Sequence, residues 1–170
     1  INAGVGRFIF SSTAAVYGNQ DESLISEDAT CNPANPYGTS KLMSEQILRD
    51  ASQAHDLSYV ALRYFNVAGA DPAGRAGQLS KTATHLIKVA VEVATGQRAS
   101  MQVFGTDYPT NDGTCVRDYI HITDLISAHI AALEHLLGGG ASLTLNCGYG
   151  KGSSVSQVLL DLEPFVLALR

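Results

Sequence analysis

The sequence RFIFSST, Arg7–Thr13, joins a short apolar run directly to a run of hydroxylated residues. Phe8–Phe10 consists of residue types that favour strands, and a buried parallel strand is typically a continuous apolar run. In open α/β sheets, ligands bind at the carboxyl ends of the strands. The stretch therefore predicts a parallel strand whose carboxyl end opens onto a ligand site, with Ser11, Ser12 and Thr13 facing it. The alternative for Ser11 and Ser12 is that they only cap the following turn.

Strand and helix patterns alternate along the rest of the chain. Asn35-Pro36 is typical of a helix N-cap followed by proline in the first turn, and the helix is expected to continue to about Ala54. The other predicted strands are Tyr59–Tyr64, Met101–Phe104, Tyr119–Ile122 and Leu143–Asn146. The other predicted helices are Thr84–Thr95, Asp124–Leu137 and Val155–Leu169, the last broken at Pro164. This alternation predicts an α/β fold with a parallel sheet.

Tyr37 and Lys41 stand four residues apart at the start of the first predicted helix. Residues at i and i+4 share a helical face, so the ammonium group can lie beside the phenol ring. A neighbouring cation favours the phenolate form of a tyrosine, and such a phenol can act as general base toward an alcohol. The spacing also occurs by chance in many helices, so the motif depends on its surroundings for support.

Several motifs occur in the order found in extended short-chain dehydrogenase/reductases. They are SSTAAVYG (residues 11–18), PYGTSK (36–41), LRYFNVAG (62–69) and VRDYIHI (116–122). The chain resembles this family from about Gly4 to about Val158. The segment GTDYP with DGT, residues 105–114, makes it similar to the UDP-glucose 4-epimerase branch. Sugar-nucleotide dehydratases of the family carry an acidic pair after the strand-end threonine, where this chain has Ala14 and Ala15.

The resemblance implies an incomplete doubly wound, Rossmann-like parallel sheet with part of a small substrate-binding domain. Residues 1–78 would be the second half of the NAD-binding domain, and residues 118–150 would return to it. Residues 79–117 would belong to the UDP-sugar-binding domain, and residues 151–170 would form a truncated or divergent C-terminal helix. The sequence lacks a glycine-rich turn with an acidic residue about 20 positions further on. The chain is therefore expected to be an internal part of the full enzyme.

The same resemblance implies NAD-dependent epimerisation at C4 of a UDP-hexose through a 4-keto intermediate, with NAD as the cofactor. Tyr37 would be the general base. Lys41 would favour the phenolate and hold the nicotinamide ribose, and Thr13 would hydrogen-bond the reacting sugar hydroxyl. The other implied cofactor contacts are Ser11, Tyr64 and Phe65. The implied sugar-nucleotide contacts are Thr13, Asn66, His85, Phe104 and Arg117.

Each of these residues also has a purely structural interpretation. The candidates that suit a strand whatever the function are Thr13, Tyr64, Phe65 and Phe104. Asn66 ends an apolar strand and needs a hydrogen-bond partner in any case. His85 could be an exposed helix residue, and Arg117 could form an ion pair with Asp118 or another carboxylate. For the whole chain, two alternative functions stay open. One is another UDP-sugar-modifying enzyme, such as a decarboxylase or another 4-epimerase. The other is a non-catalytic sugar-nucleotide-binding module.

The amino-acid composition of the chain limits which classes of binding partner it is expected to have. With 170 residues, a net charge of −5 and a pI near 5.4, the chain is not expected to bind nucleic acid. No apolar stretch approaches the length of a membrane span, and no basic-plus-apolar leader opens the chain. The three cysteines are widely spaced, which predicts free thiols in a reducing cytoplasm, and the five histidines show no metal-ligand spacing. The resemblance implies a homodimer for the full-length enzyme.

Overall fold

The computed structural model of the protein describes residues 3–20, 24–80, 82 and 84–168. Strands and helices alternate over most of this length, as the sequence predicts. The elements are β1 (Arg7–Thr13), η1 (Ala14–Val16), α1 (Pro36–Ala54), β2 (Ser58–Tyr64), β3 (Asn66–Ala68), α2 (Leu86–Ala94), β4 (Val116–His121), α3 (Ile122–Leu137), β5 (Leu143–Cys147), β6 (Gly152–Ser154) and α4 (Val155–Ala168). Among the described residues, no helix is both long enough and apolar enough to cross a bilayer.

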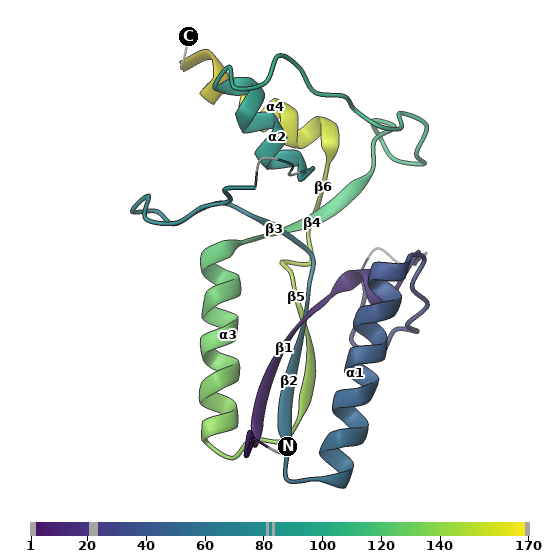
Figure 1. The fold of residues 1–170 in the computed structure, drawn as a ribbon. Coiled ribbons are helices and arrows are strands. Elements are labelled where there is room, and N and C mark those ends of the chain that lie inside the picture. The colour runs from purple at the N-terminus through teal and green to yellow at the C-terminus, as the bar shows by residue number, and fades with distance from the viewer. Residues whose placement is uncertain (1–2, 21–23, 81, 83, 169–170) are drawn as a thin grey trace.

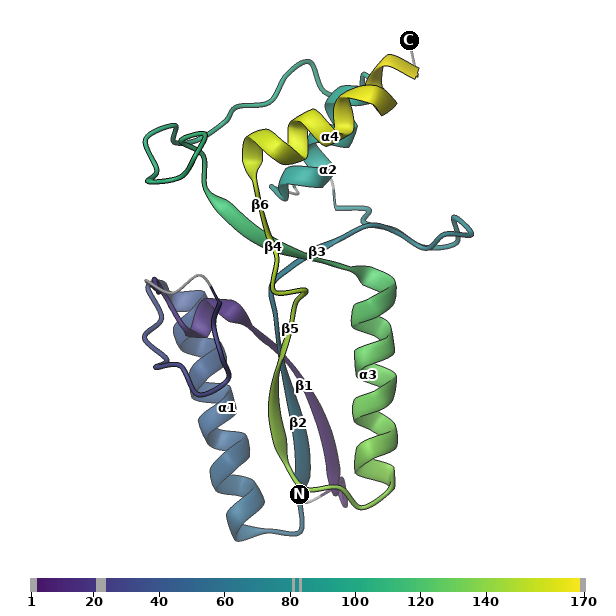
Figure 2. The ribbon, with the colours of Figure 1, turned by 180° about the vertical axis from the view of Figure 1, so that it is seen from behind.

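The first sheet has the order β1-β2-β5, and both of its pairings are parallel. α1 covers one face and α3 covers the other (Figures 1 and 2). Successive side chains of a strand point to opposite faces. Ser12 and Arg63 therefore meet α1, while Ser11 and Leu62 lie on the side of α3. The predicted parallel α/β arrangement is confirmed.

The two faces of this sheet differ in chemistry. On the α3 side, Val60 and Leu62 of β2 pack in one apolar cluster with Leu125 and Leu136 of α3. The α1 side instead contains buried polar residues, which are Ser12, Glu45 and Arg63. The α3 face therefore contributes hydrophobic stabilisation, which scales with the apolar area removed from water.

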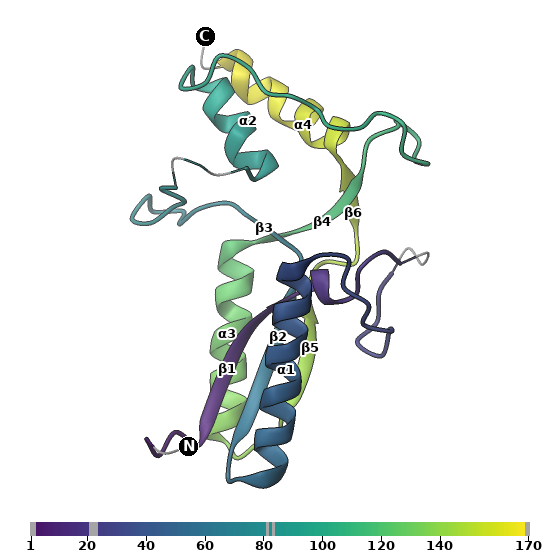
Figure 3. The same ribbon diagram turned by 45° about the vertical axis from the view of Figure 1, so that its right-hand side comes forward.

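The second sheet consists of β3, β4 and β6, with β3 parallel and β6 antiparallel to β4. α2 and α4 pack against each other beyond it (Figure 3). One passage of the chain from the first sheet to the second is at Gly148. A Cβ atom there would lie 2.7 Å from Asp118 Oδ2 and 2.9 Å from Phe65 Cδ2. A larger residue there would therefore have to displace the Asp118 carboxylate or the Phe65 ring where the two sheets adjoin.

Two sequence-based predictions about secondary structure are wrong. Met101–Phe104 is not a strand, and none of the described strands pairs with it. An apolar run alone does not make a strand, because its backbone groups need partners in a sheet. α4 is not broken at Pro164 but continues to Ala168. Proline removes one helical hydrogen bond, and only a single turn of α4 follows it.

Candidate active site

A cavity of about 1010 Å³ lies at the carboxyl ends of the parallel strands. This is the position at which open α/β sheets bind ligands. The ends of β1 and β2 and the residues that follow them contribute Thr13, Ala14, Ala15, Tyr64, Phe65 and Asn66. The loop between η1 and α1 contributes Gly18, Asn19, Leu24, Ile25, Glu27, Ala34 and Asn35. β4, β5 and the segment that leads into β6 contribute Val116, Arg117, Asp118, Asn146, Gly148, Gly150, Lys151 and Gly152.

The first turn of α1 packs directly on the wall of this cavity. Asn35 is its N-cap, as predicted, and its side chain accepts a hydrogen bond from Gly38 N at 2.9 Å. A Cβ atom at Gly38 would lie 2.5 Å from the carbonyl oxygen of Ala15, a residue that lines the cavity. Tyr37, in the same turn, has an exposed fraction of 53%. The phenol is therefore accessible close to the cavity, although Tyr37 is not one of its lining residues.

Lys41 lies beside Tyr37, as the i, i+4 spacing predicts. Its Nζ is 5.8 Å from the centre of the Tyr37 ring and 5.1 Å from that of Phe10. The same Nζ donates a hydrogen bond to the main-chain carbonyl of Ser11 at 2.9 Å. The ammonium group thus joins the start of α1 to the end of β1.

The hydroxyl groups at the end of β1 point in different directions. The Oγ of Ser11 lies 3.4 Å from His129 Nε2 on α3, and the Oγ of Ser12 donates to Glu45 Oε1 on α1 at 2.5 Å. Of the hydroxylated residues of β1, only Thr13 lines the cavity. The expectation that Ser12 faces the site is wrong, because its side chain is fully buried against α1, and neighbouring residues of a strand alternate between its two helix-covered faces. The side chain of Ser11 lies on the α3 side, and its contact with the cofactor stays a prediction.

The last residue of β2 and the two that follow it reach the cavity together. Tyr64, Phe65 and Asn66 all line it, and Asn66 Nδ2 donates to the carbonyl oxygen of Asp118 at 3.1 Å. Asn66 also lines a second cavity, of about 370 Å³, which His85 helps to enclose. His85 is the N-cap of α2 and makes no side-chain capping bond. The structure therefore brings Asn66 and His85 to one cavity.

Arg117 lines the larger cavity and is exposed. Its Nη1 donates to the carbonyl oxygen of Val116 at 3.0 Å, and no carboxylate among the described residues forms an ion pair with it. The carboxylate of Asp118 instead accepts hydrogen bonds from Tyr149 N at 3.1 Å and Gly150 N at 2.8 Å. The alternative of an ion pair between neighbours is thus not observed, and the Arg117 guanidinium is available to a ligand.

Phe104 is not brought together with the other candidates. Its exposed fraction is 80%, and it lines neither cavity. The alternative interpretation of Phe104 as a strand-core residue is wrong, because Met101–Phe104 is not a strand, and the contact between Phe104 and a sugar nucleotide stays a prediction.

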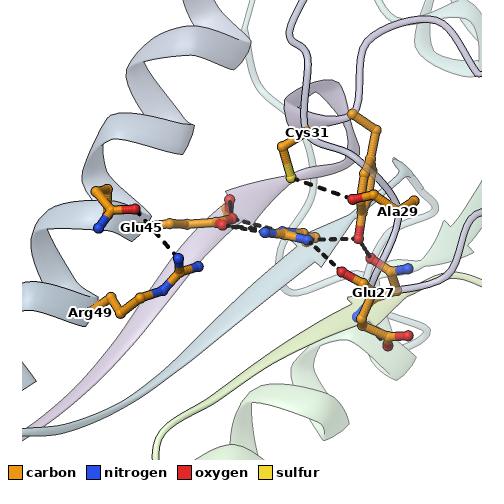
Figure 4. Close-up of polar contacts among 10 residues, drawn as sticks. Glu27, Ala29, Cys31, Glu45 and Arg49 are labelled. Carbon is orange, nitrogen blue, oxygen red and sulfur yellow. Dashed lines mark hydrogen bonds and ion pairs between the residues drawn. The ribbon is translucent and has the colours of Figure 1, made fainter.

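A buried polar network of Glu45, Arg63, Tyr17 and Asn146 lies beside the cavity and is not among the features predicted from the sequence (Figure 4). Arg63 Nε donates to both carboxylate oxygens of Glu45, at 3.0 and 3.2 Å, and Nη2 donates to Oε2 at 2.6 Å. Arg63 Nη1 donates to the hydroxyl of Tyr17 at 2.8 Å, and that hydroxyl donates to Asn146 Oδ1 at 2.7 Å. Burial opposes the charge of Arg63, yet hydrogen bonds to Glu45 and Tyr17 hold its pKa above the usual value. Burial also raises the pKa of Tyr17.

Two signals in the sequence could have indicated this network. Glu45 continues the series Tyr37, Lys41 at the same four-residue spacing, so it shares their face of α1. Arg63 is a charged residue inside the otherwise apolar strand β2. A charge that is buried in this way requires a partner.

Comparison with known proteins agrees with this architecture. The sequence model of the NAD dependent epimerase/dehydratase family matches residues 1–148. The chain belongs to this family. A UDP-glucose 4-epimerase of Azospirillum brasilense is 60% identical to it over 163 residues, which are 96% of this chain and 47% of that protein. A UDP-glucose 4-epimerase of Rhizobium meliloti (strain 1021) is 48% identical over 95% of this chain and 49% of its own length.

Solved structures of family members share the fold. UDP-glucose 4-epimerase from Brucella ovis, in complex with NAD, superposes with a TM-score of 0.89 at 46% identity, covering 93% of this chain and 49% of that one. The enzyme from Stenotrophomonas maltophila, with NAD and formylated UDP-arabinopyranose, gives a TM-score of 0.90 at 45% identity, covering 96% and 49%. The chain thus spans about half the length of the family members that it matches.

Proposed function

We propose that this chain carries the catalytic tyrosine of an NAD-dependent enzyme that inverts C4 of a UDP-hexose and interconverts UDP-glucose and UDP-galactose. The observation that carries the proposal is the placement of Lys41 beside Tyr37, with Thr13 on the cavity wall. Support comes from the relatives above, which are named UDP-glucose 4-epimerase and two of which were crystallised with NAD.

In this proposal each residue has a separate task. The exposed phenol of Tyr37 takes the proton of the sugar 4-hydroxyl, and the ammonium of Lys41 favours the phenolate. Thr13 Oγ1 accepts a hydrogen bond from Ala15 N at 3.2 Å, which leaves its proton free to orient the same sugar hydroxyl. NAD, when bound, supplies the chemistry of hydride acceptance and return.

The residues of this chain fit one end of NAD. Tyr64 and Phe65 line the cavity with aromatic side chains, which suits a nicotinamide ring. The sequence contains no glycine-rich turn of the kind that cradles the diphosphate of a dinucleotide. The chain therefore provides the reacting end of the cofactor site.

Substrate binding is assigned to the second sheet and its surroundings. Arg117 offers a guanidinium at the cavity that forms no ion pair with the described carboxylates, which suits a diphosphate. Asn66 with His85 offers polar groups at the adjoining cavity. Apart from Thr13 and Asn66, residues 1–78 and 118–150 then form the cofactor side, and residues 79–117 belong to the sugar-nucleotide side. A homodimer and a cytoplasmic location for the complete enzyme are part of the same proposal and rest on the resemblance.

A chimera tests the proposal directly. The segment of the Azospirillum brasilense relative that matches this chain is replaced by the present sequence, and conversion of UDP-galactose to UDP-glucose is measured. We expect turnover by the chimera. Tyr37→Phe should reduce kcat by about 10²–10⁴ while the bound NAD is retained. A folded, NAD-containing chimera with no epimerase activity, or a fully active Tyr37→Phe variant, would refute the assignment.

A further inference from the structure

α1 is anchored to β1 by two consecutive residues of the strand. Lys41 donates to the main-chain carbonyl of Ser11, and Glu45 accepts a hydrogen bond from the hydroxyl of Ser12. With Tyr37 they stand at i, i+4 and i+8 on one helical face. α1 itself runs along the sheet (Figure 1). The next residue of β1 is Thr13, on the cavity wall. The two anchors thus determine how α1, which carries Tyr37, sits against the strand that carries Thr13.

Arg63 connects this anchor to the opposite wall of the cavity. Its Nη1 donates to the carbonyl oxygen of Glu27 at 3.3 Å, on the loop that precedes α1. Asn146 of β5 holds the same loop, because its Nδ2 donates to the carbonyl of Ile25 and its main-chain N donates to Glu27 Oε1, each at 2.9 Å. Ile25 and Glu27 both line the cavity. Figure 4 shows Glu45 and Glu27 reaching the network from opposite sides.

Burial alone does not account for this network. A buried ion pair loses hydration on both partners, and apolar side chains of similar volume often fill the same space at no loss of stability. The α3 face of the same sheet is built in that apolar way. Glu45 and Arg63 have exposed fractions of only 1% and 4%, and no buried side-chain nitrogen or oxygen among the described residues lacks a hydrogen-bond partner. Directional, charge-assisted bonds fix relative position, which apolar packing does less strictly.

We propose that Glu45 and Arg63 are positioning residues, which together hold Tyr37 in register with Thr13 and hold the Ile25–Glu27 wall against the strand ends. They act through α1 and the loop and do not touch the substrate. The inference rests on the proposed function, since it assigns to Tyr37 and Thr13 the roles given above.

The first experiment uses the chimera and the variant Glu45→Gln, which keeps the shape of the side chain and removes its charge. Misplacement of a reacting group by about 1 Å can reduce the rate by about 10². We expect kcat to fall at least tenfold, while KM for UDP-galactose and the NAD content change less than threefold. The matched control is Leu136→Ala, in the apolar cluster on α3. Leu136→Ala should lower Tm at least as much as Glu45→Gln does. It should leave kcat of the folded enzyme within threefold of the parent value.

The second experiment separates helix anchoring from support of the loop. Tyr17→Phe removes the hydroxyl that joins Arg63 to Asn146 and leaves the Glu45 ion pair in place. Hydrogen exchange of the 170-residue chain should accelerate in residues 24–34 in Tyr17→Phe. In Glu45→Gln it should accelerate both there and in the first turns of α1. If Glu45→Gln does not fold, Glu45→Leu combined with Arg63→Met, which removes both charges, is measured in its place.

The outcomes are distinct. Retained kcat in Glu45→Gln, or an equal loss of kcat in Leu136→Ala at the same Tm, would overturn the inference and leave the proposed function standing. An inactive parent chimera would overturn the proposed function itself. In that case, unchanged hydrogen exchange in Tyr17→Phe and Glu45→Gln would still show that the network does not anchor α1 and the loop. Faster exchange in the variants would show that the network holds the cavity wall, whatever reaction the enzyme catalyses.

Discussion

The Nζ of Lys41 lies 5.8 Å from the centre of the Tyr37 ring. The same nitrogen donates to the carbonyl oxygen of Ser11, so one ammonium group serves both the phenol and the strand end. The position of the cation relative to the ring is therefore set by the strand as well as by the helix. This arrangement makes the geometry of the site sensitive to any change in how α1 meets β1.

Lys41→Met in the chimera should reduce kcat by at least about tenfold. The substitution removes the cation and a charge-assisted hydrogen bond, which contributes about 1.5–3 kcal/mol. Steady-state kinetics with UDP-galactose measure the effect. Arg49→Met is the control, since Arg49 is an exposed residue of the same helix whose side chain donates to Gln46. Equal kcat values for Lys41→Met and Arg49→Met would show that Lys41 has no part in catalysis.

Arg117→Ala should raise KM for UDP-galactose about tenfold or more, with less effect on kcat. A guanidinium that binds a diphosphate acts on a part of the substrate that does not react, and loss of such a bond costs about 1.5–3 kcal/mol. Arg75→Ala is the control, because Arg75 is exposed, bonds Asp71 and lines neither cavity. An unchanged KM in Arg117→Ala would show that Arg117 does not bind the substrate diphosphate.

Gly38→Ala should destabilise the chain by about 1–3 kcal/mol, as overpacking in a close contact does. Helix propensity alone predicts the opposite sign, since alanine is favoured over glycine by about 1 kcal/mol in a helix. The steric term dominates because the new Cβ would lie 2.5 Å from Ala15 O and 2.9 Å from Pro33 Cβ. Urea unfolding of the 170-residue chain checks the sign. Ser40→Ala, at an exposed position of the same helix, should be nearly neutral.

Ionisation of Tyr17 should lower the free energy of unfolding as the pH rises above 10. Burial raises the pKa of this phenol above its ordinary value of 10.0. The folded state therefore binds the proton more tightly than the unfolded state, so the contribution to stability is complete below pH 10 and is lost as the pH rises through the folded-state pKa. The free energy of unfolding, measured by urea titration at several pH values, should fall more steeply above pH 10 in the parent chain than in Tyr17→Phe. Parallel curves would contradict this.

Local patterns in the sequence predicted much of the fold and part of the site. The apolar runs of β1 and β2, the Asn35-Pro36 start of α1 and the neighbouring positions of Tyr37 and Lys41 are all present in the structure. Strand alternation, capping and i, i+4 geometry depend on residues close in sequence, and those residues determine them whatever the remainder of the chain does.

Only the tertiary structure decided which side chains face the cavity and which are buried beneath it. Ser12 points away from the site because α1 brings Glu45 to that face, and Glu45 meets Arg63 across the sheet. Met101–Phe104 has the composition of a strand but no neighbour to pair with, so Phe104 stays exposed. Pairing, burial and the partner of a buried charge depend on segments far apart in the sequence. They are settled only when the helices pack on the sheet, because a buried polar group must find its partner there.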